Sequence, residues 1–321
     1  MNKLEVRNLK LYYHTSKGVV RGLDGVSFHL DSGETLGVVG ESGCGKTTLG
    51  TALLNMPTPP GRIEDGQVLL DGKSILQLSE GEFRRIIRWE RISMVFQGAM
   101  NCLTPVYTVR KQMMETLQYH RPMEIAEAEE RIRKYVNLVG LSEDVLRRYP
   151  HELSGGMKQR IVIAMALFLE PDVVICDEPT TALDVVVQAQ IINLLKDLKR
   201  QLHLSFIFIT HDLATEAEVS DRIMVMYAGK AVEIGTNEQI YGTQGPAHPY
   251  TRMLLAATPR LHRKVDQLAF IPGTPPDLLE PPAGCRFHPR CPLASARCRQ
   301  EEPPLETIEP GHQAACWEVL S

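Results

Sequence analysis

The sequence predicts an α/β protein whose central sheet is mostly parallel. Over about the first 240 residues, short apolar runs of strand length alternate with longer segments of helical periodicity, as in strand–helix–strand units. Of the apolar runs, that at 35–39 enters a glycine-rich loop, and those at 173–176 and 205–209 lead into polar residues. Parallel sheets bind ligands at the carboxyl ends of their strands, so we expect the chemistry of this protein at that edge.

Two segments have the apolar spacing of amphipathic helices. Apolar residues recur at intervals of three and four from 124 to 139, and they do so again from 188 to 202. The first segment belongs to a more helical stretch, which we interpret as a helical subdomain inserted at about 96–171.

The character of the sequence changes after Gly235. Prolines become frequent, and four of the seven cysteines fall within the last 37 residues. We therefore expect a first domain at 1–244 and a small, irregular, cysteine-rich C-terminal domain at 245–321.

The composition is that of a globular chain with a sizeable core. Hydrophobic residues make up 43% and charged residues 23%, and the net charge of −4 argues against an extensive nucleic-acid interface. No apolar run approaches the roughly 18 residues that would cross a bilayer, and the N-terminus has no signal-peptide pattern. We expect a cytoplasmic chain that meets a membrane only through a partner.

The segment 40–48, GESGCGKTT, matches the phosphate-loop pattern G-x-x-x-x-G-K-[ST]. Glycines at 43 and 45 let backbone N–H groups surround phosphates, and the helix that follows adds a favourable dipole. Lys46 is expected at the β- and γ-phosphates, Thr47 at Mg²⁺ and Thr48 at the α-phosphate. The predicted ATP contacts in this loop are Gly40, Ser42, Gly43, Cys44, Gly45, Lys46, Thr47 and Thr48.

An acidic pair follows the apolar run 173–176. Asp177 is placed to hold Mg²⁺ through water, and Glu178 to accept a proton from the water that attacks ATP. Alone, such a pair is more often a solvated strand end. In a chain that also carries a phosphate loop, we favour the catalytic interpretation.

Further motifs complete a family pattern. Gln97 follows the apolar residues 94–96, the segment 153–160 reads LSGGMKQR, Asp184 follows TTAL, and His211 follows IFIT. In this order they resemble the nucleotide-binding subunit of an ATP-binding-cassette (ABC) transporter. That resemblance implies a P-loop ABC ATPase core with the inserted helical subdomain described above.

The resemblance assigns roles to these motifs. Ser154, Gly155 and Gly156 would contact the γ-phosphate of an ATP bound to a partner cassette, and Asp184 would cross the same interface. His211 would contact the γ-phosphate. Gln97 would touch Mg²⁺ and the lytic water.

One further contact concerns the base of ATP. An aromatic side chain of this family stacks on adenine, and Tyr13 is our choice over its neighbour Tyr12. The resulting catalytic set is Glu178, His211 and Gln97, and the Mg²⁺ set is Thr47, Gln97 and Asp177.

Four cysteines crowd the C-terminal region: Cys285, Cys291, Cys298 and Cys316. Four thiolates suit tetrahedral zinc or an iron–sulfur cluster, and their spacing does not decide between the two. The segments 247–251, AHPYT, and 284–292, GCRFHPRCP, are similar to the tail of the oligopeptide/dipeptide importer ATPases. Some of those bind a [4Fe–4S] cluster through these cysteines, so we expect such a cluster, with zinc or unliganded thiols as alternatives.

The resemblance implies an ATPase that energises a membrane importer for peptides. We expect a heterodimer with a second ABC ATPase, two permease subunits, an extracytoplasmic solute-binding protein, and a peripheral position on the cytoplasmic face of the cell membrane. Oligosaccharide, nickel or glutathione are alternative cargoes. A soluble ABC ATPase is a further alternative, although the sequence shows neither a second cassette nor a long coiled-coil insertion.

Overall fold

The computed structural model describes residues 2–257 and 270–320, which form two compact units. The first unit consists mainly of Ile75–Phe208, with Asp31–Glu34 and the first residues of the chain. The second consists of Leu4–Leu30, Thr35–Ser74 and the chain from Ile209 onward. The C-terminal extension therefore belongs to the same compact unit as the phosphate-loop segment.

Three adjacent sheet strands belong to the first unit, in the order β8-β7-β6. β6 and β7 pair in parallel, with Ile92 opposite Val173 and Val95 opposite Cys176. Every residue of these strands is buried, as expected of a parallel sheet that is covered on both faces. The bounds are β6 Ile92–Val95, β7 Val173–Asp177 and β8 Ser205–Ile209.

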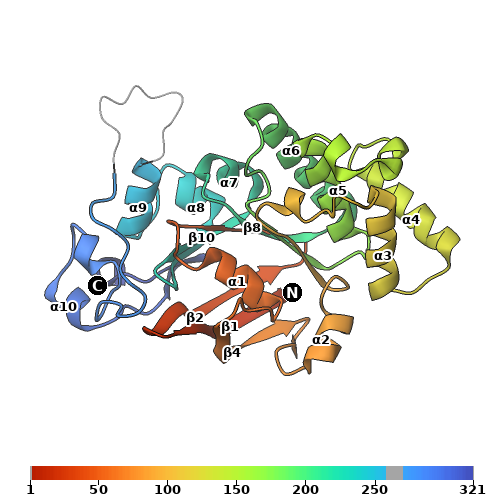
Figure 1. Ribbon diagram of the computed structural model, residues 1–321. Helices are drawn as coiled ribbons and strands as arrows, with labels where there is room; N and C mark the ends of the chain where they lie inside the picture. The colour runs from red at the N-terminus through yellow and green to blue at the C-terminus, as the bar shows by residue number, and fades with distance from the viewer. Residues whose placement is uncertain (1, 258–269, 321) are drawn as a thin grey trace. The chain divides into compact units, whose positions relative to one another are not determined.

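The helical subdomain expected from the sequence appears in the first unit as α3, α4 and α5, which pack together (Figure 1). The prediction at 124–139 is confirmed by α4, which buries Ala128, Ile132 and Val136. The prediction at 188–202 is confirmed by α6, although α6 begins earlier because Asp184 caps it. The helices of this unit are α2 Glu80–Ile86, η1 Ala99–Asn101, α3 Val109–His120, α4 Ile125–Leu138, η2 Glu143–Arg147, η3 Pro150–Glu152, α5 Gly155–Leu167 and α6 Val185–Leu202.

The second unit contains an antiparallel sheet with the strand order β2-β1-β4-β5. Leu4 of β1 lies opposite Leu70 of β4, and the pairing continues to Tyr13 opposite Gly61. The bounds are β1 Asn2–Thr15, β2 Gly18–Asp31, β4 Gly61–Leu70 and β5 Lys73–Ser74.

A second set of strands in this unit runs in the order β11-β12-β10-β9-β3. β3 pairs in parallel with β9, whereas the remaining neighbours pair antiparallel. The bounds are β3 Thr35–Val39, β9 Arg222–Tyr227, β10 Lys230–Thr236, β11 Glu306–Glu309 and β12 His312–Ala314. The helices of the unit are α1 Lys46–Leu53, α7 Leu213–Val219, α8 Asn237–Tyr241, α9 Pro249–Ala256, η4 His288–Arg290, α10 Ala296–Gln300 and α11 Trp317–Leu320.

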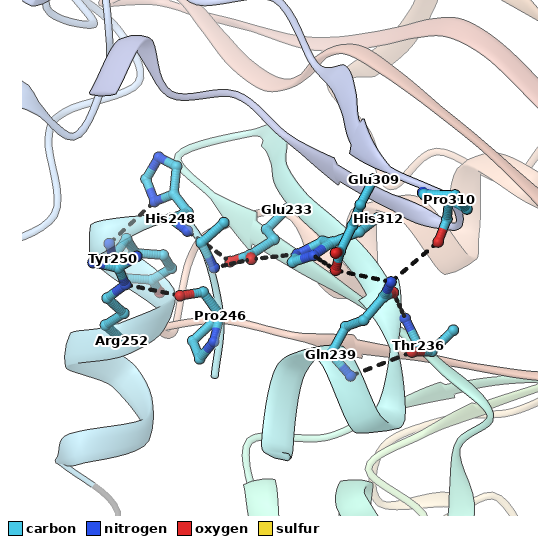
Figure 2. Close-up of polar contacts among 11 residues, drawn as sticks. Glu233, Thr236, Gln239, Pro246, His248, Tyr250, Arg252, Glu309, Pro310 and His312 are labelled. Carbon is cyan, nitrogen blue, oxygen red and sulfur yellow. Dashed lines mark hydrogen bonds and ion pairs between the residues drawn. The ribbon is translucent and has the colours of Figure 1, made fainter. Parts of the chain in front are cut away.

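The C-terminal extension has more regular structure than its prolines suggested, because β12 extends the sheet beside β10. A buried carboxylate, that of Glu233, joins the two (Figure 2). It accepts hydrogen bonds from the backbone N–H groups of Ala247 (2.6 Å) and His248 (3.2 Å), and it bonds to His312 Nε2 (2.8 Å). A buried carboxylate is stable only when so satisfied, so this residue fixes β10, the start of α9 and β12 to one another.

An aromatic cluster adds apolar contacts between the extension and β9. The ring of Tyr250 lies 4.6 Å from that of Tyr227 and 5.3 Å from that of Phe287, measured between centroids. All three rings are almost fully buried. Within the part of the chain that the structure describes, no helix is both long and apolar enough to span a bilayer.

Candidate nucleotide-binding site

The phosphate-loop segment lies in the second unit, between the buried strand β3 and helix α1. Two of its glycines are required by close backbone approaches. A Cβ at Gly40 would lie 2.2 Å from the carbonyl oxygen of Met226, and one at Gly45 would lie 2.6 Å from that of Gly22. Both residues have positive φ angles, of 151° and 106°. The loop thus has the tight glycine turn that the sequence predicted.

Lys46 begins α1 and folds back over this loop. Its ammonium group donates hydrogen bonds to the carbonyl oxygens of Gly40 (2.7 Å) and Glu41 (3.1 Å). Its side chain is buried, whereas Ser42, Gly43 and Thr47 are exposed. Exposed glycine backbone around a lysine cation is the arrangement that binds phosphate oxygens.

Cys44 packs its side chain under the loop and exposes only 4% of its surface. Burial raises the pKa of the Cys44 thiol. The side chain is therefore a neutral packing group at neutral pH, and any contact of Cys44 with phosphate would come from its backbone N–H.

The structure distinguishes the two candidate aromatic residues. The Tyr13 hydroxyl is hydrogen-bonded to Thr48 Oγ1 in α1 (2.9 Å). The Tyr12 hydroxyl instead donates to Asp24 (2.6 Å), and burial with this bond raises the pKa of Tyr12 to about 12. Of the two, it is Tyr13 that is bonded to the phosphate-loop helix.

His211 also belongs to the second unit and follows the end of β8. The preceding residue, Thr210, donates its N–H to the carbonyl oxygen of Val38 in β3 (3.4 Å). Val38 lies two residues before Gly40, the first residue of the phosphate loop. The bond between Thr210 and Val38 therefore places His211 close in the chain to a contact with the strand that leads into this loop. The His211 side chain is exposed.

The first unit joins Gln97 to Glu178. Gln97 Nε2 donates to Glu178 Oε2 (3.0 Å), and Thr181 Oγ1 donates to the same oxygen (2.9 Å). Glu178 has a φ angle of 48°, which is uncommon outside glycine and often marks a functional turn. Asp177, just before it, ends β7 and is almost completely buried. The sequence had given Gln97 and Glu178 related roles without showing that they touch.

The signature segment and Asp184 also lie together in the first unit. Ser154 and Asp184 are the N-caps of α5 and α6, accepting from the N–H groups of Met157 (3.3 Å) and Val187 (3.0 Å). A Cβ at Gly156 would lie only 2.7 Å from Val187 Cγ1. Two exposed capped helix ends are therefore neighbours, which makes a surface suited to an anion or a partner chain.

The four C-terminal cysteines line one small cavity of the second unit, together with Phe287 and Trp317. Burial raises the pKa of Cys285 to about 11, and it also raises the pKa values of Cys291 and Cys316. Among the residues that the structure describes, no group of three or more His, Cys, Asp or Glu side chains has the arrangement of a metal site. The cysteines therefore share a cavity without the geometry of bound ligands.

Sequence reasoning missed the contacts that hold the phosphate loop from outside. Glu41 pairs with Arg290, which is 249 residues away along the chain. Glu41 lies in the phosphate-loop motif and Arg290 in the C-terminal motif GCRFHPRCP, but the sequence assigns neither residue a role. No local spacing signals a pair so distant in sequence.

Comparisons with known proteins agree with these features. Residues 23–181 match the ABC transporter family, and residues 232–298 match the oligopeptide/dipeptide transporter C-terminal region. The first match contains the phosphate loop, the signature and the acidic pair. Fold and site together define an ATP-binding-cassette ATPase.

Individual relatives show to which group of ATP-binding-cassette ATPases the chain belongs. The dipeptide transport ATP-binding protein DppD of Bacillus subtilis is 45% identical over 98% of this chain and 94% of its own length. The oligopeptide transport ATP-binding protein OppD of Escherichia coli is 44% identical over 99% of this chain and 93% of its own. The chain belongs to the family of ATP-binding subunits of oligopeptide and dipeptide ABC transporters.

Solved structures support the same fold. The dimeric ATP-binding cassette MJ0796, bound to ADP and phosphate, covers 73% of this chain and 98% of its own, with 26% identity and a TM-score of 0.65. CbiO1 of Clostridium perfringens covers 76% and 92%, with 27% identity and a TM-score of 0.66.

Proposed function

We propose that this chain binds and hydrolyses ATP to energise the import of peptides through a membrane ABC transporter. The observation that carries the proposal is the identity of 44–45%, over nearly the whole length, to subunits named for peptide transport. The C-terminal match supports a peptide importer in particular, because it covers residues 232–298, which lie beyond the ABC transporter match at 23–181.

In this proposal the ATP phosphates lie on the loop from Gly40 to Thr48, with Lys46 as the principal cation. The close glycine approaches and the exposed backbone of the loop support this. Tyr13 stacks on adenine, and its bond to Thr48 supports its choice over Tyr12. His211 contacts the γ-phosphate.

Thr47, Gln97 and Asp177 are the proposed Mg²⁺ residues. Their hydroxyl, amide and carboxylate oxygens are of the kind that Mg²⁺ prefers. When bound, Mg²⁺ would neutralise charge on the β- and γ-phosphates.

Glu178 is the proposed general base, which takes a proton from the attacking water. Its hydrogen bond from Gln97 orients the carboxylate and puts a water-positioning amide beside it.

Ser154, Gly155, Gly156 and Asp184 are proposed to face a partner cassette. Their neighbouring positions at two helix starts, with Ser154 and Asp184 exposed, support this. We propose a second ABC ATPase as this partner, together with two permeases and an extracytoplasmic solute-binding protein. The chain would then lie on the cytoplasmic face of the cell membrane as a peripheral subunit.

Cys285, Cys291, Cys298 and Cys316 are proposed to hold a [4Fe–4S] cluster, with zinc as the alternative. The support is that all four thiols line one cavity. Bound there, the group would cross-link the extension and so stabilise its fold.

The proposal is tested by purifying the tagged chain from its native membranes in mild detergent and identifying its partners. Recovery of two permeases and a solute-binding protein loaded with peptide is the expected result. A binding protein loaded with oligosaccharide, nickel or glutathione would change the cargo. Recovery with ribosomes or DNA alone would contradict the transport function.

A further inference from the structure

Glu41, the second residue of the phosphate loop, is held by two residues of the C-terminal extension. Arg290 donates from Nη1 to Glu41 Oε2 (2.6 Å) and from Nη2 to Glu41 Oε1 (3.0 Å). The hydroxyl of Tyr250 accepts the backbone N–H of Glu41 (2.9 Å). Both the side chain and the backbone of this loop residue are therefore bonded to the extension. We call Glu41, Tyr250 and Arg290 the clasp.

The clasp is rigidly supported. The Arg290 side chain is only 5% exposed and makes further bonds to the carbonyl oxygen of Pro272 (2.8 Å) and the hydroxyl of Tyr227 (3.2 Å). The bond to Glu41 raises the pKa of Arg290, which stays charged at all relevant pH values. Tyr250 is fully buried against Tyr227 and Phe287. Paired, planar and preorganised groups of this kind give strong charge-assisted hydrogen bonds.

The clasp acts on the part of the loop next to the lysine. The carbonyl oxygen of Glu41 accepts a hydrogen bond from Lys46 Nζ (3.1 Å). Glu41 thus contacts the principal phosphate-binding cation through its backbone and the extension through its side chain. Its carboxylate also places a negative charge in a loop that must receive a polyanion.

We propose that Arg290 and Tyr250 are positioning residues for ATP, by which the C-terminal extension prepares the phosphate loop for nucleotide. Arg290 offsets the charge of Glu41 and fixes its carboxylate, and Tyr250 fixes the adjoining backbone. This inference rests on the proposed assignment of residues 40–48 as the ATP loop. It gives the extension a direct role in ATP binding, separate from any group held by its cysteines.

The test is equilibrium ATP binding and steady-state hydrolysis by the full-length chain in its purified complex. In Arg290→Gln, the carboxylate of Glu41 loses its partner, so we expect the Kd for ATP to rise about tenfold. At saturating ATP, kcat should stay within about twofold of the wild-type value, because Arg290 takes no part in the chemical step.

The double variant Glu41→Gln with Arg290→Gln separates charge compensation from general packing. It removes the carboxylate together with its partner, so we expect the Kd to return to within about threefold of the wild-type value. The matched control is Arg7→Gln, which breaks an exposed ion pair with Glu5 in the same unit and should leave the Kd unchanged.

Several results would overturn the inference. One is an unchanged Kd in a folded Arg290→Gln variant. Another is a double variant as weak as the single one, which would reduce Arg290 to a packing residue. If Arg290→Gln does not fold, Tyr250→Phe decides: it removes only the acceptor of the Glu41 N–H, and an ATP affinity equal to wild type contradicts the role.

A Lys46→Ala variant separates this inference from the proposed site. Retained ATP binding in that variant would refute the phosphate-loop assignment itself. Lost binding in Lys46→Ala, combined with an unchanged Kd in Arg290→Gln, would refute the clasp alone.

Discussion

The two units of the molecule fix their functional residues in different ways. In the first, the contacts are mostly local: Ser154 and Asp184 cap the helices they begin, and Thr181 bonds Glu178 three residues away. In the second, the phosphate loop is held by Tyr250 and Arg290, more than 200 residues further along the chain. The helix starts of the first unit therefore depend on local contacts, although its Gln97–Glu178 bond spans 81 residues, whereas the ATP loop depends on the C-terminal extension.

We therefore expect substitutions in the two units to have different effects. The largest effect is expected from Glu178→Gln in the first unit. Without the base, kcat should fall at least about a hundredfold, while ATP binding is retained. Steady-state hydrolysis and equilibrium binding measure the two separately. Glu301→Gln, at an exposed ion pair, is the control and should hydrolyse normally. Substantial ATP hydrolysis by the Glu178→Gln variant would contradict the assignment of Glu178 as the general base.

The second prediction concerns the cysteine cavity. Cys291→Ser should lower the iron content of protein purified without oxygen, because it removes one of the four thiolates proposed to hold the cluster. Metal analysis of the purified protein measures this. Cys102→Ser, at an exposed cysteine outside the cavity, should retain the iron. Equal iron in both variants would exclude Cys291 as a ligand, and zinc in the wild type would favour the alternative metal.

The third prediction tests whether Glu233 anchors the extension. The Glu233 carboxylate takes part in three hydrogen bonds, and Glu233→Gln puts an amide N–H₂ donor in the place of one of its oxygens. We expect the free energy of unfolding of the second unit to fall by about 2–4 kcal/mol. Denaturant titration measures the change. Glu309 is the other carboxylate partner of His312, and its side chain is 43% exposed. Glu309→Gln should therefore lower the free energy of unfolding by less than about 1 kcal/mol. Equal effects from the two variants would contradict the anchor.

The fourth prediction is a pH dependence, which reaches its full size only at the acid end of the range. Burial lowers the pKa of His248 to about 4, so the folded chain keeps this residue neutral while the unfolded chain protonates it near its ordinary pKa of 6.5. Its contribution to stability is complete above pH 6.5 and is lost as the pH falls towards 4, by up to about 3 kcal/mol. Glu216 has the opposite sign: burial raises its pKa to about 8, so its contribution declines as the pH rises from 4.5 through 8.

Denaturant unfolding between pH 4 and 7 tests the acid-side prediction for His248. The control is His248→Asn, which can still cap the N–H of Tyr250 but does not titrate, so the dependence should flatten. The same slope in wild type and variant would show that another group is responsible.

Much of this architecture could be predicted from sequence, because its signals are local. The strands predicted at 35–39 and 205–209 agree with β3 and β8, because a short apolar run that ends at a functional motif is a clear signal of a buried strand. The helix at 124–139 followed from its periodicity. The motif order identified the cassette, and the tail motifs identified the peptide-importer branch that the comparisons support.

What the sequence did not predict depends on contacts between distant segments. The two short strands β11 and β12 lie in a proline-rich region; β12 pairs with β10, β11 pairs with β12, and the buried carboxylate of Glu233 bonds to His312 of β12. The clasp joins residues 249 positions apart, so no periodicity could indicate it. The four cysteines were expected to form a ligand set, but the structure shows only a shared cavity.

The most direct test of the central claim is ATP-driven peptide uptake by proteoliposomes containing the complex purified through this chain. We predict that a labelled peptide accumulates with the wild-type chain, ATP and the solute-binding protein. The complex carrying Glu178→Gln should bind ATP without uptake. A complex that hydrolyses ATP, binds the peptide-loaded solute-binding protein and still moves no peptide would contradict the proposed function.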